Sequence, residues 1–307
     1  MTRFVHGGFV LAGVVVCLSA GCAVQHPPGK GKLTLLREKT TQRHYWLYLP
    51  EEYVAQSQRG IKTPVHPATQ NGQWPLVVSL HGMKPFDNCR PQAQEWQQES
   101  DRYGFITIAP KLMTSDLFME FPLKNANHSS VQGDERAVVA ITREVLDALP
   151  VDEKRVLSTS WGSGGYLAHY LVNRHPGLFS CLAVRQSSFS ADVLEPQQVE
   201  RYRDLPIGIF WSRSDPAACQ AESRKAVEWY QQQGLRNVSW AVFAGTGRER
   251  MPQIAAALFA LQCGIKPNQP ATFAKLFEAH GKTGRAIGHA RRTAPRAAIP
   301  VQPARVD

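Results

Sequence analysis

The segment that most constrains the fold is a glycine-rich stretch in the middle of the chain, Arg155-Val-Leu-Ser-Thr-Ser-Trp-Gly-Ser-Gly-Gly-Tyr166. Its first residues predict a short apolar strand, its glycines a sharp turn, and the residues after them a helix. A strand, a sharp turn and a helix in this order present one side chain, between small flanking residues, at the top of a sheet. Here the flanks are Ser160 and Gly164, and the presented position is Gly162. Glycine has no side chain, so the turn is predicted without the nucleophile that such a turn normally exposes.

Strands and helices alternate on both sides of this turn. The predicted buried strands are residues 74–80, 104–109, 156–160, 206–211 and 238–244, with a further antiparallel edge strand at 45–49. The predicted helices are residues 134–149, 164–175, 219–233 and 252–263, and the predicted loop insertions are 56–73 and 112–133. This alternation predicts an α/β domain over residues 41–263, built on a mostly parallel sheet with helices on both faces.

The N-terminus carries an export signal. An apolar run over residues 9–20 follows Arg3 and is too short to span a bilayer as a mature helix, which is typical of a secretory signal. The run ends in Leu18-Ser-Ala-Gly-Cys22, which resembles a bacterial lipobox except that Ser19 stands where leucine is usual. We therefore predict a lipoprotein signal peptide over residues 1–21, a lipidated Cys22 and a linker over 22–40. The protein would then be anchored by lipid in the cell envelope, facing the periplasm or the exterior. An ordinary signal cleaved nearby, which would leave Cys22 a free thiol, is the alternative.

Four cysteines remain after Cys17 of the signal and Cys22 are set aside, namely Cys89, Cys181, Cys219 and Cys263. Their spacing fits neither a CxxC motif nor a metal site, so we expect no metal and no cofactor. Export permits one or two disulfides, whose pairing the sequence leaves open. Cys181 lies in an apolar stretch and is predicted to be a small buried residue.

Positive charge is concentrated at the C-terminus. Residues 264–307 hold eight Lys or Arg against two acids, so +6 of the net charge of +10 lies there. The segment is rich in Ala and Pro and predicts a disordered basic tail. Attraction to anionic lipid headgroups or polymers is one interpretation, and a merely solvated tail is the other. No basic motif interleaved with aromatic residues is present, so no nucleic-acid partner is expected.

Several motifs in order resemble one superfamily. They are Leu76-Val-Val-Ser-Leu-His-Gly82, Gly104-Phe-Ile-Thr-Ile-Ala-Pro110, Asp134-Glu-Arg-Ala137, the turn described above and Arg174-His-Pro176. Over residues 45–264 the chain resembles the α/β-hydrolases, and most closely the secreted esterases related to polyhydroxybutyrate depolymerases and feruloyl esterases. The resemblance implies an α/β-hydrolase fold with a catalytic site at the carboxyl ends of the strands.

The resemblance also assigns roles to positions in this site. His81-Gly82 would supply a backbone N–H to an oxyanion hole, with His81 bracing the loop, and the N–H of Ser163 would be the second donor. Asp215 occupies the acid position after the strand at 206–211, where a simple turn aspartate before proline is the alternative. The base position falls on Arg248, and no histidine occurs between His175 and His280.

Two of the three catalytic positions therefore lack their functional group. Gly162 offers no nucleophile, and Arg248 stays protonated and cannot act as a general base. We predict a catalytically inactive member that binds a small molecule or polymer, anionic ones included. An active esterase with a displaced nucleophile, Ser160 or Ser163, is the alternative, with His280 or His289 of the tail as candidate bases. A purely structural role is the third.

Arginine in the base position also suggests what replaced the chemistry. The acid and base positions of the resembled family are in contact, so Asp215 and Arg248 are expected to pair. If Arg248 turned toward Gly162 instead, the helix N-terminus there would form a small anion site.

Overall fold

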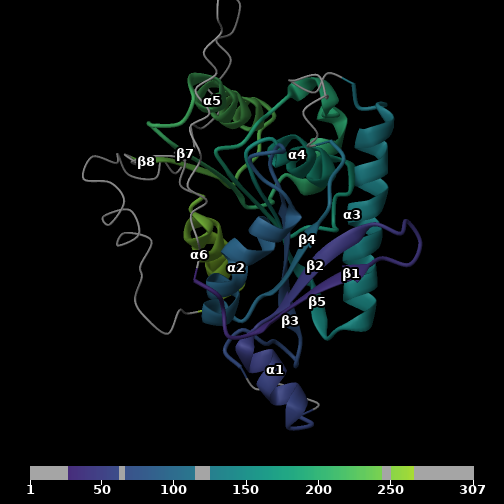
Figure 1. Cartoon of the computed structure of the whole chain (residues 1–307). Helices are drawn as coiled ribbons and strands as arrows, with labels where there is room; N and C mark the ends of the chain where they lie inside the picture. Colours follow the sequence, from purple (N-terminus) through teal and green to yellow (C-terminus); the bar gives the residue numbers. More distant parts are fainter. Residues whose placement is uncertain (1–26, 62–65, 115–124, 244–249, 266–307) are drawn as a thin grey trace, which may run out of the picture.

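The computed structural model describes residues 27–61, 66–114, 125–243 and 250–265, which form a single eight-stranded sheet with helices on both faces (Figure 1). The strands are β1 (Lys32–Arg37), β2 (His44–Leu49), β3 (Trp74–Leu80), β4 (Ile106–Pro110), β5 (Val151–Trp161), β6 (Cys181–Arg185), β7 (Ile207–Ser212) and β8 (Val238–Phe243). The helices are α1 (Glu51–Gln58), α2 (Cys89–Tyr103), α3 (Ser129–Ala148), α4 (Gly164–Arg174), α5 (Ala217–Gln232) and α6 (Pro252–Gln262).

The strand order is β1-β2-β4-β3-β5-β6-β7-β8. β2 pairs antiparallel with β1 and β4, and every other neighbouring pair is parallel. The predicted α/β class and mostly parallel sheet are confirmed. The strand predicted at 45–49 is present as β2 and is antiparallel, but it is not at the edge of the sheet, because β1 covers it from within the segment predicted to be a linker. β6 and α2 were not predicted, and α3 begins inside the predicted 112–133 loop.

Each face of the sheet has its own core. Alternate residues of β3 point to opposite faces, so Leu76 and Val78 join one cluster of buried side chains and Val77 joins the other. The first cluster includes residues of α3, α4 and α5, and the second includes residues of α2 and α6, which pack together. The parallel strands are buried on both sides, which explains why they read as continuous apolar runs in the sequence.

The parallel strands all end at one edge of the sheet, and the turn that contains Gly162 lies there, between β5 and α4 (Figure 1). The loops after β3, β4, β6 and β7 begin at the same edge. In open α/β sheets this is where ligands bind. The chain enters β1 at the opposite edge, because Lys32 pairs with Leu49 at the end of the antiparallel β2.

Some segments for which the sequence makes predictions lie outside the described residues. The lipobox with Cys22 and the basic tail beyond residue 265 are among them. Within the described residues, no helix is long and apolar enough to cross a bilayer, and no cluster of three or more His, Cys, Asp or Glu side chains is placed to hold a metal. The four cysteines in this part of the chain form no disulfide, and Cys181 is fully buried.

Candidate functional site

Gly162 adopts the backbone conformation of a sharp strand-to-helix turn. Its φ angle is +60°, in the left-handed region that favours glycine. Its carbonyl accepts hydrogen bonds from the N–H groups of Gly165 and Ser188, both at 3.0 Å, and its own N–H donates to the Arg185 carbonyl at 3.3 Å. The turn is thus tied both to the first turn of α4 and to the end of β6.

Steric contacts explain which positions of the turn must be small. A Cβ atom on Gly164 would come within 2.5 Å of the Leu80 carbonyl oxygen. The backbone could not move far enough to relieve this contact. Among the described residues, a Cβ atom on Gly162 would meet only the Cα of Gly82, at 3.8 Å. A side chain would therefore fit at position 162, at a backbone cost of about 1–2 kcal/mol for the left-handed conformation. Space for a nucleophile remains although the nucleophile is absent.

The two alternative nucleophiles are both enclosed. Ser160 lies within β5 between β3 and β6, opposite Leu80 and Val184, and has no exposed surface. Ser163 is the N-cap residue of α4, with φ −65° and ψ −17°, and its side chain does not cap the helix. Neither hydroxyl has a hydrogen-bond partner among the described residues, so no base activates either one there.

His81 braces the loop after β3, as the resemblance implies. Its Nε2 atom accepts a hydrogen bond from the Leu112 N–H at 2.8 Å, so Nδ1 carries the proton and donates to the Gly82 carbonyl at 2.9 Å. Burial lowers the pKa of His81, and the nearby carboxylates of Asp87 and Asp134 only partly oppose this. With both ring nitrogens engaged, His81 links the loops after β3 and β4 and is not placed as a catalytic base.

The expected oxyanion donor in this loop is already occupied. The N–H of Gly82 donates to Oδ2 of Asp87 at 2.7 Å, and the same oxygen accepts from Nε2 of Gln92 at 3.0 Å. An internal carboxylate thus takes the hydrogen bond that a ligand oxyanion would need from this N–H.

Asp215 lies where the resemblance places it, in the turn after β7, and only 4% of its surface is exposed. Its Oδ2 accepts from the Ser212 N–H at 2.7 Å, and its carbonyl accepts from the Gln220 amide at 2.8 Å. These contacts close the turn that leads into α5. Arg248 lies outside the described residues, so its pairing with Asp215 stays a prediction.

A buried ionic network that the sequence did not reveal fills the space beside the turn. Arg250 donates to Oδ1 of Asp87 at 2.7 Å and to Oε2 of Glu95 at 3.2 Å. Arg185 at the end of β6 lies 2.7 Å from the other oxygen of Glu95 and donates to the Arg250 carbonyl at 2.7 Å. Two cations thus neutralise two carboxylates in a region almost closed to water.

Arg250 also covers the residue before the turn. Its guanidinium lies 4.5 Å from the ring centroid of Trp161, whose Nε1 donates to the Gln186 side chain at 3.0 Å. Burial lowers the pKa of Arg250, but the charges of Glu95 and Asp87 outweigh it and raise the pKa above the usual value. The guanidinium is therefore a fixed positive charge stacked on an indole face. It holds this side of the site closed.

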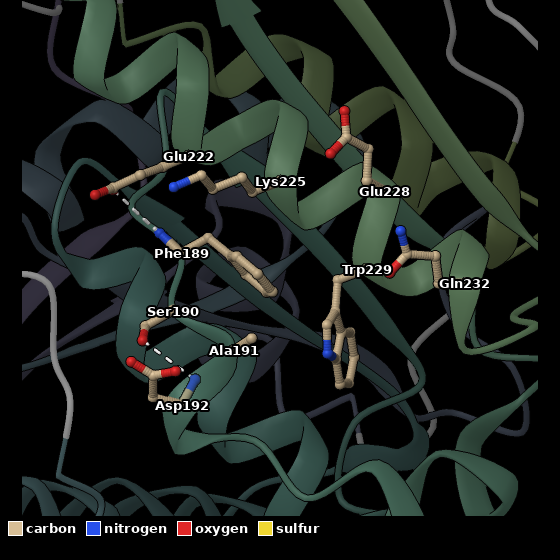
Figure 2. A pocket seen from close by; sticks show the side chains of 9 residues that line it. All are labelled: Phe189, Ser190, Ala191, Asp192, Glu222, Lys225, Glu228, Trp229 and Gln232. Carbon is tan, nitrogen blue, oxygen red and sulfur yellow. Dashed lines mark hydrogen bonds between the residues drawn. The ribbon is translucent and has the colours of Figure 1, made fainter.

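A groove lies next to the turn, between α5 and the short helix η1 (Ala191–Val193) (Figure 2). Its volume is about 340 Å³. It is lined by Phe189, Ser190, Ala191, Asp192, Glu222, Lys225, Glu228, Trp229 and Gln232. Phe189 directly follows Ser188, which is bonded to Gly162, so the groove adjoins the turn. Three carboxylates against one ammonium group make the lining net negative, which suits a neutral or cationic ligand better than an anion.

The model of a protein family described as "Esterase PHB depolymerase" matches residues 63–230, just over half of the chain. No protein of curated function is similar enough in sequence to match.

Solved structures of esterases share the fold. The chain is 10% identical to S-formylglutathione hydrolase from Staphylococcus aureus, with a TM-score of 0.56 over 77% of this chain and 98% of that one. It is 14% identical to a ferulic acid esterase, with a TM-score of 0.51 over 78% of this chain and 98% of that one. It is also 14% identical to the thermophilic carboxylesterase EstE1, with a TM-score of 0.51 over 80% of this chain and 92% of that one. The predicted α/β-hydrolase fold is confirmed.

Proposed function

Because this chain belongs to the esterase PHB depolymerase family, we propose that it has kept the family's scaffold, has lost its hydrolytic chemistry and now binds its ligand without cleaving it. The observation that carries the proposal is Gly162. It occupies the left-handed turn after β5, where the side chain of a nucleophile would project, and it has none. Losing a triad serine alone costs a hydrolase about 10⁶ in kcat.

Other contacts support the loss of chemistry. The Gly82 N–H is committed to Asp87, and Arg250 covers Trp161. Ser160 and Ser163 are enclosed and lack a base among the described residues. A serine hydrolase needs an activated nucleophile and donors aimed at the developing oxyanion. The described part of this site offers no activated nucleophile, and one of its two expected donors, the Gly82 N–H, is already bound to Asp87.

The groove beside η1 is the proposed place of binding. It has the two aromatic side chains Phe189 and Trp229 and four charged groups. Glu222 is held in place, because it accepts from the Tyr166 hydroxyl at 3.1 Å and from the Phe189 N–H at 3.3 Å. A largely preformed lining of this kind is typical of small-molecule sites. We therefore propose a neutral or cationic ligand here, while the anion site near Gly162 depends on Arg248.

Turnover of short acyl esters tests the proposal. We expect the purified protein to hydrolyse them no faster than the buffer does, and Ser160→Ala and Ser163→Ala to change nothing. Turnover abolished by one of those two substitutions would establish a displaced nucleophile and overturn the proposal. Turnover that survives both would show that the catalytic site lies elsewhere.

We also propose that the protein is an exported lipoprotein, on the strength of the apolar run at 9–20 and the lipobox that ends at Cys22. Bacteria grown with a palmitate analogue should tag the protein, and Cys22→Ser should abolish the tag and release the protein from membranes. Cys89→Ser is the matched control and should leave the tag in place. Mature protein that begins at another residue and carries no lipid would contradict this proposal.

A further inference from the structure

An exposed patch with apolar and basic side chains lies beside the turn. It consists of Lys84 and Phe86 in the loop after β3, Arg90 in the first turn of α2, and Lys111 and Met113 after β4; we call it the loop patch. Phe86 is 59% exposed and Met113 is 48% exposed, and both are among the most exposed large apolar residues of the described chain. They lie on two loops that a hydrogen bond from the Leu112 N–H to His81 joins, and exposed apolar side chains on adjoining loops can mark an interaction surface.

Hydrogen bonds and ring contacts hold the three segments of the loop patch together. The loops after β3 and β4 are joined through His81 and the Leu112 N–H. The Arg90 guanidinium lies 5.4 Å from the centroid of the Trp46 ring on β2, and the Lys111 N–H donates to the carbonyl of His44 on the same strand at 3.0 Å. The loop patch is therefore a defined surface on the ordered sheet edge.

The charge of the loop patch has one sign. Residues 83–90 and 111–114 contain Lys84, Arg90 and Lys111 and a single acid, Asp87. Asp87 is buried, and its carboxylate is bound to Arg250 and to the Gly82 N–H. Among the described residues of these two loops, the exposed charges are therefore those of Arg90 and Lys111, and both are positive. Lys and Arg beside exposed apolar side chains match a bilayer that presents anionic headgroups over acyl chains.

We propose that the loop patch docks on an anionic lipid bilayer, with Phe86 and Met113 entering the headgroup region and Arg90 and Lys111 contacting lipid phosphates. In this docked orientation the turn at Gly162 would face the bilayer. This inference does not depend on the loss of hydrolysis.

Chain length permits docking together with the proposed lipid at Cys22. The chain enters the sheet at Lys32, at the edge opposite the loop patch. The N–H groups of residues 29–31 are bound to side chains of α2 and β2, so the available tether is the seven peptide links from Cys22 to Gly29, which can span up to about 25 Å. A six-residue strand is only about 20 Å long, so one bilayer can hold the lipid and contact the loop patch.

Oxidation of Met113 tests the proposal on the full-length protein, whether or not it is lipidated. The protein is incubated with neutral phosphatidylcholine vesicles, or with vesicles containing about one-third phosphatidylglycerol, and treated with dilute hydrogen peroxide. Mass spectrometry then follows sulfoxide formation at Met113, with the buried Met251 as an internal reference. We expect Met113 to oxidise several-fold more slowly on the anionic vesicles only, and high salt to remove this protection.

Two double variants separate docking by the loop patch from simple tethering. Arg90→Gln/Lys111→Gln removes two cations and should weaken docking about 30-fold, which abolishes the protection of Met113. Arg59→Gln/Lys154→Gln removes equal charge from exposed positions elsewhere and should keep the protection. Equal oxidation on both kinds of vesicle would overturn the proposal, as would protection that persists in the first variant. If soluble polyphosphate protected Met113 from oxidation as well as the anionic vesicles do, the loop patch would be a binding site for polyanions, and the proposal of bilayer docking would be overturned.

Discussion

Replacing Arg250 with alanine should lower the free energy of unfolding by about 3–5 kcal/mol. Only 13% of the Arg250 side chain is exposed, and it bridges Asp87 and Glu95, whose side chains are fully buried. Among the described residues, the variant leaves the two carboxylates with Arg185 as their one close cation, in a region from which water is largely excluded. Urea denaturation at neutral pH measures the change.

Arg236→Ala is the control for this experiment. Arg236 also pairs with an aspartate, Asp204, at 3.1 Å, but the two side chains are 65% and 70% exposed. An exposed pair contributes about 1 kcal/mol at most, because water and salt screen it. If Arg250→Ala cost no more than Arg236→Ala, the network beside the turn would not be the closed structure described above.

Lowering the pH should destabilise the fold through His169. This residue of α4 is fully buried, its Nδ1 lies 2.8 Å from the Tyr230 hydroxyl, and burial lowers its pKa from 6.5 to about 3. In the unfolded chain His169 becomes protonated below about pH 6.5, whereas in the folded protein it stays neutral until about pH 3. The free energy of unfolding is therefore unaffected by this histidine above pH 6.5, and it decreases as the pH falls from about 6.5 to about 3. The loss is roughly 3 kcal/mol by about pH 4 and on the order of 5 kcal/mol in full.

His169→Gln isolates this contribution. Glutamine keeps a polar group near Tyr230 and does not titrate, so the variant should lose much less stability than the wild type between about pH 7 and pH 4. Unfolding free energies of both proteins at several pH values provide the comparison. Parallel curves for the two proteins would mean that His169 is protonated in the folded state or is exposed to water.

The sequence predicted the elements that have strong apolar patterns. β3, α4 and α6 agree with their predicted bounds to within about a residue, because buried parallel strands and apolar helices produce a direct signal. β1 was missed because it is an edge strand with alternating exposure and polar residues. α2 was missed because it buries Gln92, Glu95 and Glu99 in place of an apolar stripe.

The same reason explains which part of the site remained hidden. Gly162, His81 and Asp215 follow strands and could be assigned from motifs with fixed spacing. The buried network depends on Arg250 meeting Glu95 and Asp87, which precede it by 155 and 163 residues. In the sequence all of these residues read as ordinary surface charges, since nothing local shows that they are buried. The one available signal of burial was Trp96, a large apolar residue in an otherwise polar helix, directly beside Glu95.

The central claim, that the scaffold survives without a nucleophile, is tested most directly by the intact mass of the protein after exposure to a fluorophosphonate probe. The probe bonds covalently to an activated serine whatever substrate the enzyme prefers, and an active serine hydrolase treated in parallel verifies the reagent. The site at Gly162 predicts an unchanged mass. A single stoichiometric adduct that maps to Ser160 or Ser163 would contradict the claim and show an active hydrolase with a displaced nucleophile.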